Sequence, residues 1–204
     1  MTTTVADEAT NDLEAFEKEL GLPRGFIWRL LDEDDWSFVI KLHALFEAAL
    51  THGLVHKLGV EALRDVFAET ELSARNTGKV AFARALELLD KNERRFLSSL
   101  SELRNTLVHD ITNVGFKFSK HVEEFDAKQK AAFVEAFAFS HEEKFTIVGR
   151  EVARDRFTLD NPKIVVWQTG IWLLRRIYLE KEVAMLTHKA TRILLETVHA
   201  RIAT

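Results

Sequence analysis

The sequence contains no cysteine, and it has two prolines and eight glycines among 204 residues. The absence of cysteine excludes disulfide bonds, thiolate nucleophiles and zinc or iron–sulfur sites with cysteine ligands. The scarcity of proline and glycine leaves too few turn-forming residues for the many short strands of a β-sandwich or barrel. Alanine, leucine, glutamate, lysine and arginine are abundant instead, and these residues favour helices. The composition therefore predicts an all-α protein.

Long uncharged apolar runs are also missing. No stretch of about 18 such residues is available to cross a bilayer, and the first twenty residues lack the basic and apolar regions of a secretory signal. Apolar residues make up 47% of the chain and charged residues 29%, which is typical of a globular protein of one core. These features predict a single helical domain over residues 1–204, a cytoplasmic location and no membrane partner.

The net charge of −4 hides an uneven distribution of charge. Residues 1–35 hold ten acidic and three basic side chains, a sum of −7, so the remainder of the chain carries +3. Residues 91–120 hold six bases and three acids. The chain lacks the strongly positive character typical of nucleic-acid-binding proteins, but the 91–120 segment is compatible with a local anionic ligand such as RNA.

Hydrophobic periodicity predicts about six to eight helices. Helices are expected from Thr10 or Asn11 to Gly21, from Trp36 to about Thr51, over 61–69 and over 127–139. The clearest pattern lies at 79–110 and predicts a central antiparallel helical hairpin. Its apolar positions are Phe82, Leu86, Leu89, Phe96, Leu100, Leu103 and Leu107. Residues 140–162 are ambiguous: the segment at 145–149 is able to form a short strand, but no firm prediction is made there.

A long C-terminal helix is predicted over 162–204, beginning near a proline that suits a first helical turn. Its apolar positions recur at spacings of seven, four and three: Trp172, Leu179, Val183, Leu186, Ala190 and Ile193. This spacing is typical of a helix that packs against its own domain or self-associates. Burial against the domain is the interpretation we favour, because such stripes usually face the parent fold.

The helix that ends the hairpin carries a polar stripe opposite its apolar one. At about 100° per residue, three apolar positions share one face: Phe96, Leu103 and Leu107. Four polar positions share the other face: Ser98, Glu102, Asn105 and His109. His109 is therefore expected at the solvent side, one turn after Asn105, with Arg104 between the two faces.

Arg104, Asn105 and His109 are groups that could cleave RNA without a metal ion. An imidazole can take the proton of a 2′-hydroxyl or protonate the leaving oxygen, and a guanidinium can hold the phosphate as its charge develops. Four nearby bases are candidate nucleic-acid contacts: Arg94, Arg95, Lys117 and Lys120. The same pattern also fits a plain polar helix end, where Arg104 pairs with an acid and His109 is solvated.

The stretch 78–110, together with SFVIKLHALFEAAL at 37–50, resembles the mannitol operon repressor-like (MtlR/MltR) helical family and, more distantly, the HEPN superfamily. The likeness covers roughly residues 36–125, and its specific element is RNTLVHD at 104–110. The first resemblance implies a non-catalytic regulator that acts through protein partners, which is the function we expect. The second implies a homodimeric, metal-independent endoribonuclease with catalysis on Arg104, Asn105 and His109. Asp110 and Ile111 stand where many HEPN toxins have a tyrosine.

Two histidine pairs and an acidic run are weaker candidates. His52 and His56 share a helical face, as metal ligands often do, but no third ligand is evident, so neither a metal nor a cofactor is expected. His43 and Glu47 fit a local hydrogen bond. The acidic residues 32–35 fit solvated side chains that complement a helix dipole.

Two tryptophans of the C-terminal helix, Trp167 and Trp172, offer a surface on which bases could stack. Aromatic side chains in such an apolar helix are usually part of the core. We therefore expect both to be buried.

Overall fold

The computed structural model describes residues 5–147 and 149–202. Residues 1–4, 148 and 203–204, which the predicted 1–204 domain includes, lie outside the described part. The chain is mostly helical, with 75% of residues in helices and 4% in strands, which confirms the all-α prediction. Ten α-helices are described rather than six to eight, because five of them are short segments of four to seven residues.

The helices follow one another with short connections. They are α1 (Val5–Glu19), α2 (Phe26–Arg29), α3 (Asp35–Leu58), α4 (Arg64–Glu69), α5 (Lys79–Ala85), α6 (Lys91–Val108), α7 (Phe118–Glu123), α8 (Ala127–Phe137), α9 (Arg154–Asp160) and α10 (Pro162–Ile202). The ambiguous segment at 140–162 contains a strand, β1 (Lys144–Ile147), which pairs antiparallel with β2 (Arg150–Ala153). The first helix begins at Val5, earlier than the predicted Thr10 or Asn11.

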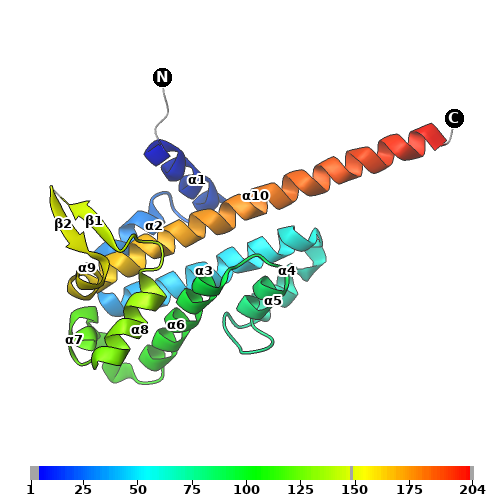
Figure 1. The fold of residues 1–204 in the computed structure, drawn as a ribbon. Helices are drawn as coiled ribbons and strands as arrows, with labels where there is room; N and C mark the ends of the chain where they lie inside the picture. Colours follow the sequence, from blue (N-terminus) through cyan, green and yellow to red (C-terminus); the bar gives the residue numbers. More distant parts are fainter. Residues whose placement is uncertain (1–4, 148, 203–204) are drawn as a thin grey trace.

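The centre of the core is the contact between α3 and α10 (Figure 1). α3 was expected to end near Thr51, but it continues through Gly53 to Leu58. A side chain at Gly53 would meet Ile177 at 3.3 Å, so this glycine permits the close approach of the two helices. The helix ends instead at Gly59, which has a φ of 68° and forms the C-cap.

The predicted hairpin is present, but it is not central. α6 follows α5 after a short turn, and its four predicted apolar positions are all buried: Phe96, Leu100, Leu103 and Leu107. α5 ends at Ala85, however, and Phe82 is exposed. α6 begins at a capping box in which the Asp90 side chain accepts from the N–H of Glu93 at 2.9 Å, and Glu93 accepts from the N–H of Asp90 at 2.7 Å.

Glu93 also joins α6 to α10. Its carboxylate is fully buried and accepts hydrogen bonds from the guanidinium of Arg176. The same guanidinium donates to the carbonyl oxygen of Leu88 at 2.6 Å. One carboxylate therefore fixes both the start of α6 and the position at which α10 crosses it.

The long C-terminal helix is confirmed, but the face predicted to be buried is wrong. Its buried apolar residues are Val165, Val166, Leu173, Leu174, Ile177 and Ala184. The predicted positions Trp172, Leu179, Val183, Leu186 and Ile193 are between 38% and 66% exposed. The heptad-spaced residues do share one face of the helix, but this face is not the one that packs against the other helices. From Met185 onward every described side chain is exposed, and this half of α10 projects beyond the other helices (Figure 1).

Among the described residues, α3 is the one helix long and apolar enough to cross a membrane by length and composition. Two-thirds of its apolar window (67%) is buried inside the fold, as in the core helix of a soluble protein. Its buried side chains include Phe38, Leu42, Leu45 and Ala49.

Replacing Glu93 with alanine should lower the free energy of unfolding by about 3 kcal/mol, because it leaves the Arg176 charge without its partner and removes half of the capping box. Urea denaturation measures the change. Glu102→Ala is the matched control, since Glu102 is an exposed glutamate on the same helix, and its effect should stay within about 0.5 kcal/mol. Equal effects of the two substitutions would contradict this role of Glu93.

Candidate functional site

The three residues of the RNTLVHD segment singled out from the sequence line one pocket. The pocket has a volume of about 440 Å³ and lies between α3, the C-terminal half of α6 and the loop at 71–73. Its lining residues are His43, Glu47, Glu71, Leu72, Ser73, Ser101, Arg104, Asn105 and His109. We call it the His109 pocket.

The last turns of α6 place the predicted residues. Asn105 and His109 are exposed and Arg104 is partly buried, as their positions on the helical wheel predict. His109 is the C-cap residue of α6, and its N–H donates to the carbonyl oxygen of Asn105 at 3.3 Å. Arg104 Nη1 donates to Asn105 Oδ1 at 3.0 Å. Asn105 thus holds one edge of the guanidinium and leaves its other N–H groups available.

A second histidine, His43, forms the buried wall of the pocket. Its Nε2 lies 3.2 Å from Ser101 Oγ, and the Ser101 hydroxyl donates to the carbonyl oxygen of Leu97 at 2.9 Å. The serine proton is therefore committed, so His43 Nε2–H donates to Ser101. The hydrogen bond expected between His43 and Glu47 is wrong, because Nδ1 and Oε2 are 3.7 Å apart.

The environment of His43 keeps its ring neutral. Burial lowers the pKa of His43 to about 4, and the positive charges of Arg104 and Lys79 act in the same direction. Lys79 is itself 2% exposed, and burial lowers the pKa of its ammonium group, although Glu47 opposes this effect. The sequence indicates only a local hydrogen bond for His43 and does not identify Ser101 or Lys79, because α3, α5 and α6 must pack before these side chains meet.

A second pocket adjoins the first and is rich in arginine. It has a volume of about 430 Å³, and its lining includes Arg75, Arg84 and Arg94 together with Glu102. Ser73 lines both pockets, so the two are neighbours. None of the three arginines forms a salt bridge with a carboxylate of the described residues. We call this the arginine pocket.

The four predicted nucleic-acid contacts are not brought together. Arg94 lines the arginine pocket and donates from Nη1 to the carbonyl oxygen of Leu89 at 2.7 Å. Arg95 forms an ion pair with Glu135, away from both pockets. Lys117 and Lys120 are exposed residues at the start of α7 and line neither pocket.

The weaker candidates have structural partners. His52 Nε2 lies 3.1 Å from Arg64 Nη1, and no group of three or more His, Cys, Asp or Glu that could hold a metal occurs among the described residues. In the acidic run, Asp34 caps α3: it accepts from the hydroxyl of Ser37 at 2.6 Å and from the N–H of Ser37 at 2.9 Å, and these two bonds, the hydroxyl first, lower the pKa of Asp34. Asp35 accepts from the N–H of Phe118 at 2.9 Å.

The two tryptophans differ. Trp167 packs against the core and donates from Nε1 to the carbonyl oxygen of Ile27 at 3.0 Å. Trp172 is exposed, with its ring edge against Phe139, so the prediction that it is buried is wrong.

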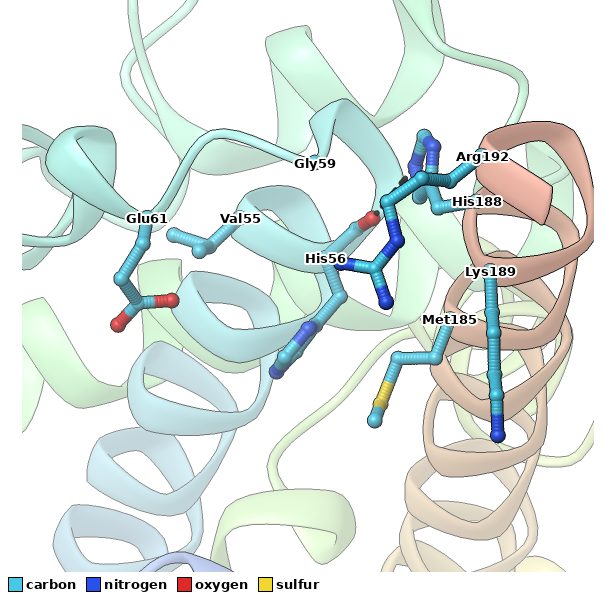
Figure 2. Close-up of a pocket in the computed structure, with 8 residues that line it drawn as sticks. All are labelled: Val55, His56, Gly59, Glu61, Met185, His188, Lys189 and Arg192. Atoms are coloured by element: carbon cyan, nitrogen blue, oxygen red, sulfur yellow. Dashed lines mark hydrogen bonds between the residues drawn. The ribbon is translucent and has the colours of Figure 1, made fainter. Parts of the chain in front are cut away.

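A pocket of about 410 Å³ lies where α3 ends beside α10 (Figure 2). Here His188 Nε2 donates to the carbonyl oxygens of His56 at 3.1 Å and Lys57 at 3.3 Å, which satisfies the C-terminus of α3. Lys189 and Arg192 of α10 also line it. None of the RNTLVHD residues contributes to it, and we interpret it as the point where α10 leaves the rest of the fold.

Comparison of the chain with protein-family models, curated proteins and solved structures gives no match. The resemblance to the MtlR/MltR family and the HEPN superfamily therefore stays a prediction. The function has to be argued from the pockets themselves.

The lowered pKa of His43 predicts a pH-dependent stability. Between about pH 4 and 6.5 the unfolded chain binds a proton that the folded state excludes. The contribution of His43 is therefore present above pH 6.5 and lost as the pH falls to about 4, by about 3 kcal/mol. Urea denaturation from pH 4 to 7 should show a smaller loss for His43→Gln than for the wild type, and parallel curves would contradict the neutral, buried state of His43.

Proposed function

We propose that this protein is a metal-independent endoribonuclease that cleaves RNA in the His109 pocket. The observation that carries the proposal is the meeting of Arg104, Asn105 and His109 at one open pocket beside a second pocket, whose three arginines form no salt bridge with a carboxylate of the described residues. The sequence favours the regulator over the ribonuclease, and the two pockets lead us to reverse this order. A plain polar helix end would need neither pocket.

The chemistry assigned to the pocket is attack by a 2′-hydroxyl on the adjacent phosphorus. The bond to the 5′-oxygen breaks, and the products are a 2′,3′-cyclic phosphate and a 5′-hydroxyl. His109 exchanges the proton with the attacking or the leaving oxygen, since it is the exposed imidazole of the pocket. Arg104 holds the phosphate and stabilises the charge that develops on it, and Asn105 orients the guanidinium.

Arg75, Arg84 and Arg94 supply the positive charge along which the RNA backbone would lie. They offset Glu47 and Glu71, whose carboxylates line the His109 pocket and repel a phosphodiester. Phosphate contacts of this kind position a nucleic acid without reading its sequence. This charge pattern suits a short single-stranded RNA segment. One phosphate would lie at Arg104 and the adjacent phosphates in the arginine pocket.

We also propose that the described helices form one domain that acts in the cytoplasm. The buried apolar cluster includes residues from α1 to α10, among them Leu13, Phe46, Phe96 and Ile177, which supports a single core. A chain without cysteine suits a reducing compartment.

Purified protein should cleave single-stranded RNA in the presence of EDTA, and the products should end in a 2′,3′-cyclic phosphate. Arg104→Ala and His109→Ala should each lower the rate about 100-fold or more, because they remove the phosphate contact and the proton-transfer group. Electrophoresis of end-labelled RNA measures the rate.

His199→Ala is the control, since His199 is an exposed histidine of α10 outside the pocket. An RNA with 2′-deoxyribose at the cleavage position should resist the enzyme. Absence of cleavage by the wild type, or equal cleavage by His109→Ala, would overturn the proposal.

A second candidate function is the non-catalytic regulator that binds a protein partner. A groove of about 310 Å³ between α6 and α8 favours it, because its lining includes the apolar and aromatic side chains Leu103, Phe125, Phe133 and Phe137. Such a groove suits an apolar segment of another protein. In this case Arg104 and His109 would have no role in the activity.

Ala132→Glu should abolish partner binding if the groove is the regulatory surface, because it places a charge on the groove wall. Ala131→Glu, an exposed neighbour on α8 outside the groove, is the matched control. Affinity capture with each variant, followed by identification of the bound proteins, measures the effect. A partner retained equally by both variants would contradict a role for the groove.

A further inference from the structure

α10 carries two apolar faces, and the fold covers one of them. At about 100° per residue, the residues that pack against the other helices or cap α3 centre on one side of α10: Leu173, Ile177, Lys181, Ala184 and His188. The heptad-spaced positions lie roughly opposite, about 150° away around the helix axis. We call this second set the α10 stripe: Leu179, Val183, Leu186, Ala190 and Ile193.

The stripe lies on a helix that has little support of its own. Among the described residues, His188 makes the last hydrogen bond from α10 to α3, and the chain remains helical to Ile202 (Figures 1 and 2). Isolated helices of about 12–15 residues are only marginally stable in water. Val183, Leu186 and Ile193 are each more than half exposed. A projecting helix with such a face needs a second surface against it.

We propose that the α10 stripe is the interface between two copies of this chain, which pair through an antiparallel coiled coil. The spacing of four and three from Leu179 to Ile193 is the repeat by which two helices interlock their side chains, and it extends to Thr197. A two-fold interface requires a surface that complements itself, and a single regular stripe meets this condition. Thr197 fits the apolar series, because its hydroxyl donates within its own helix, to the carbonyl oxygen of Ile193 at 2.8 Å, and needs no partner across the interface.

The charges beside the stripe favour the antiparallel direction. With Ala190 opposite Ile193 of the partner subunit, Lys189 faces the partner subunit's Glu196, and the symmetry repeats this pair. Moving the helices by one heptad would place Lys189 opposite its own copy and Glu182 opposite Glu196, so like charges oppose that register. In a parallel pair, Lys189 would face the uncharged Leu194. The pairing is independent of the His109 pocket.

Sedimentation equilibrium over a range of concentrations tests the dimer. Leu186→Glu and Ile193→Glu should each raise the dissociation constant about 100-fold or more, because they bury a charge in the seam. Leu195→Glu is the matched control, since Leu195 is an equally exposed leucine on the opposite side of the same helix. Circular dichroism verifies that each variant stays helical. A monomeric wild type, or an equal effect of Leu195→Glu, would overturn the proposal.

Cross-linking tests the direction, and the absence of native cysteine makes every introduced thiol unique. In the antiparallel pair Leu186 lies opposite Thr197 of the partner subunit, and the two Leu186 positions are about 16 Å apart along the axis. Oxidation should therefore link a mixture of Leu186→Cys and Thr197→Cys proteins into a heterodimer, with little linking of Leu186→Cys alone. Efficient linking of Leu186→Cys to itself would overturn the antiparallel arrangement.

Discussion

The buried carboxylate of Glu93 is the constraint on which the rest of the structure depends. It completes the capping box that starts α6 and accepts hydrogen bonds from Arg176 of α10, so it fixes two helices at one point. α6 then carries Arg104, Asn105 and His109 at its other end, four turns away. Because α6 is a rigid helix, the position of its first turn determines the position of its last turn. Glu93 therefore helps to determine the geometry of the His109 pocket.

The two pockets balance opposite charges within a small region. Glu47 and Glu71 line the His109 pocket, whereas Arg75, Arg84 and Arg94 line its neighbour. Several acidic side chains of residues 1–35 make structural contacts: Asp12 pairs with Arg175 at 2.9 Å, and Glu17 accepts from the N–H groups of Gly25 and Ile27. An acidic protein can therefore still present a locally basic surface to RNA.

The sequence predicts those features that depend on local periodicity, and it fails where two segments meet. It identifies the helical class and the solvent side of Asn105 and His109, because each follows from neighbouring residues. The helix from Trp36 is expected to end near Thr51, but it continues through Gly53, which is a point of close approach to Ile177. The stripe on α10 was assigned to the core, since periodicity reveals that a face is apolar but not what covers it. His43 and Lys79 are site residues because α3 and α5 pack against α6, and local periodicity does not predict this packing.

The central claim is that the His109 pocket binds the RNA backbone with Arg104 and His109 acting on the same phosphate. Nuclear magnetic resonance of the histidine side chains during titration with a short 2′-O-methyl RNA, which cannot be cleaved, tests this directly. The account predicts that the His109 signals shift as the RNA binds and that the His199 signals stay unchanged. Saturating RNA that leaves the His109 signals unmoved, or that shifts them no more than those of His199, would contradict it.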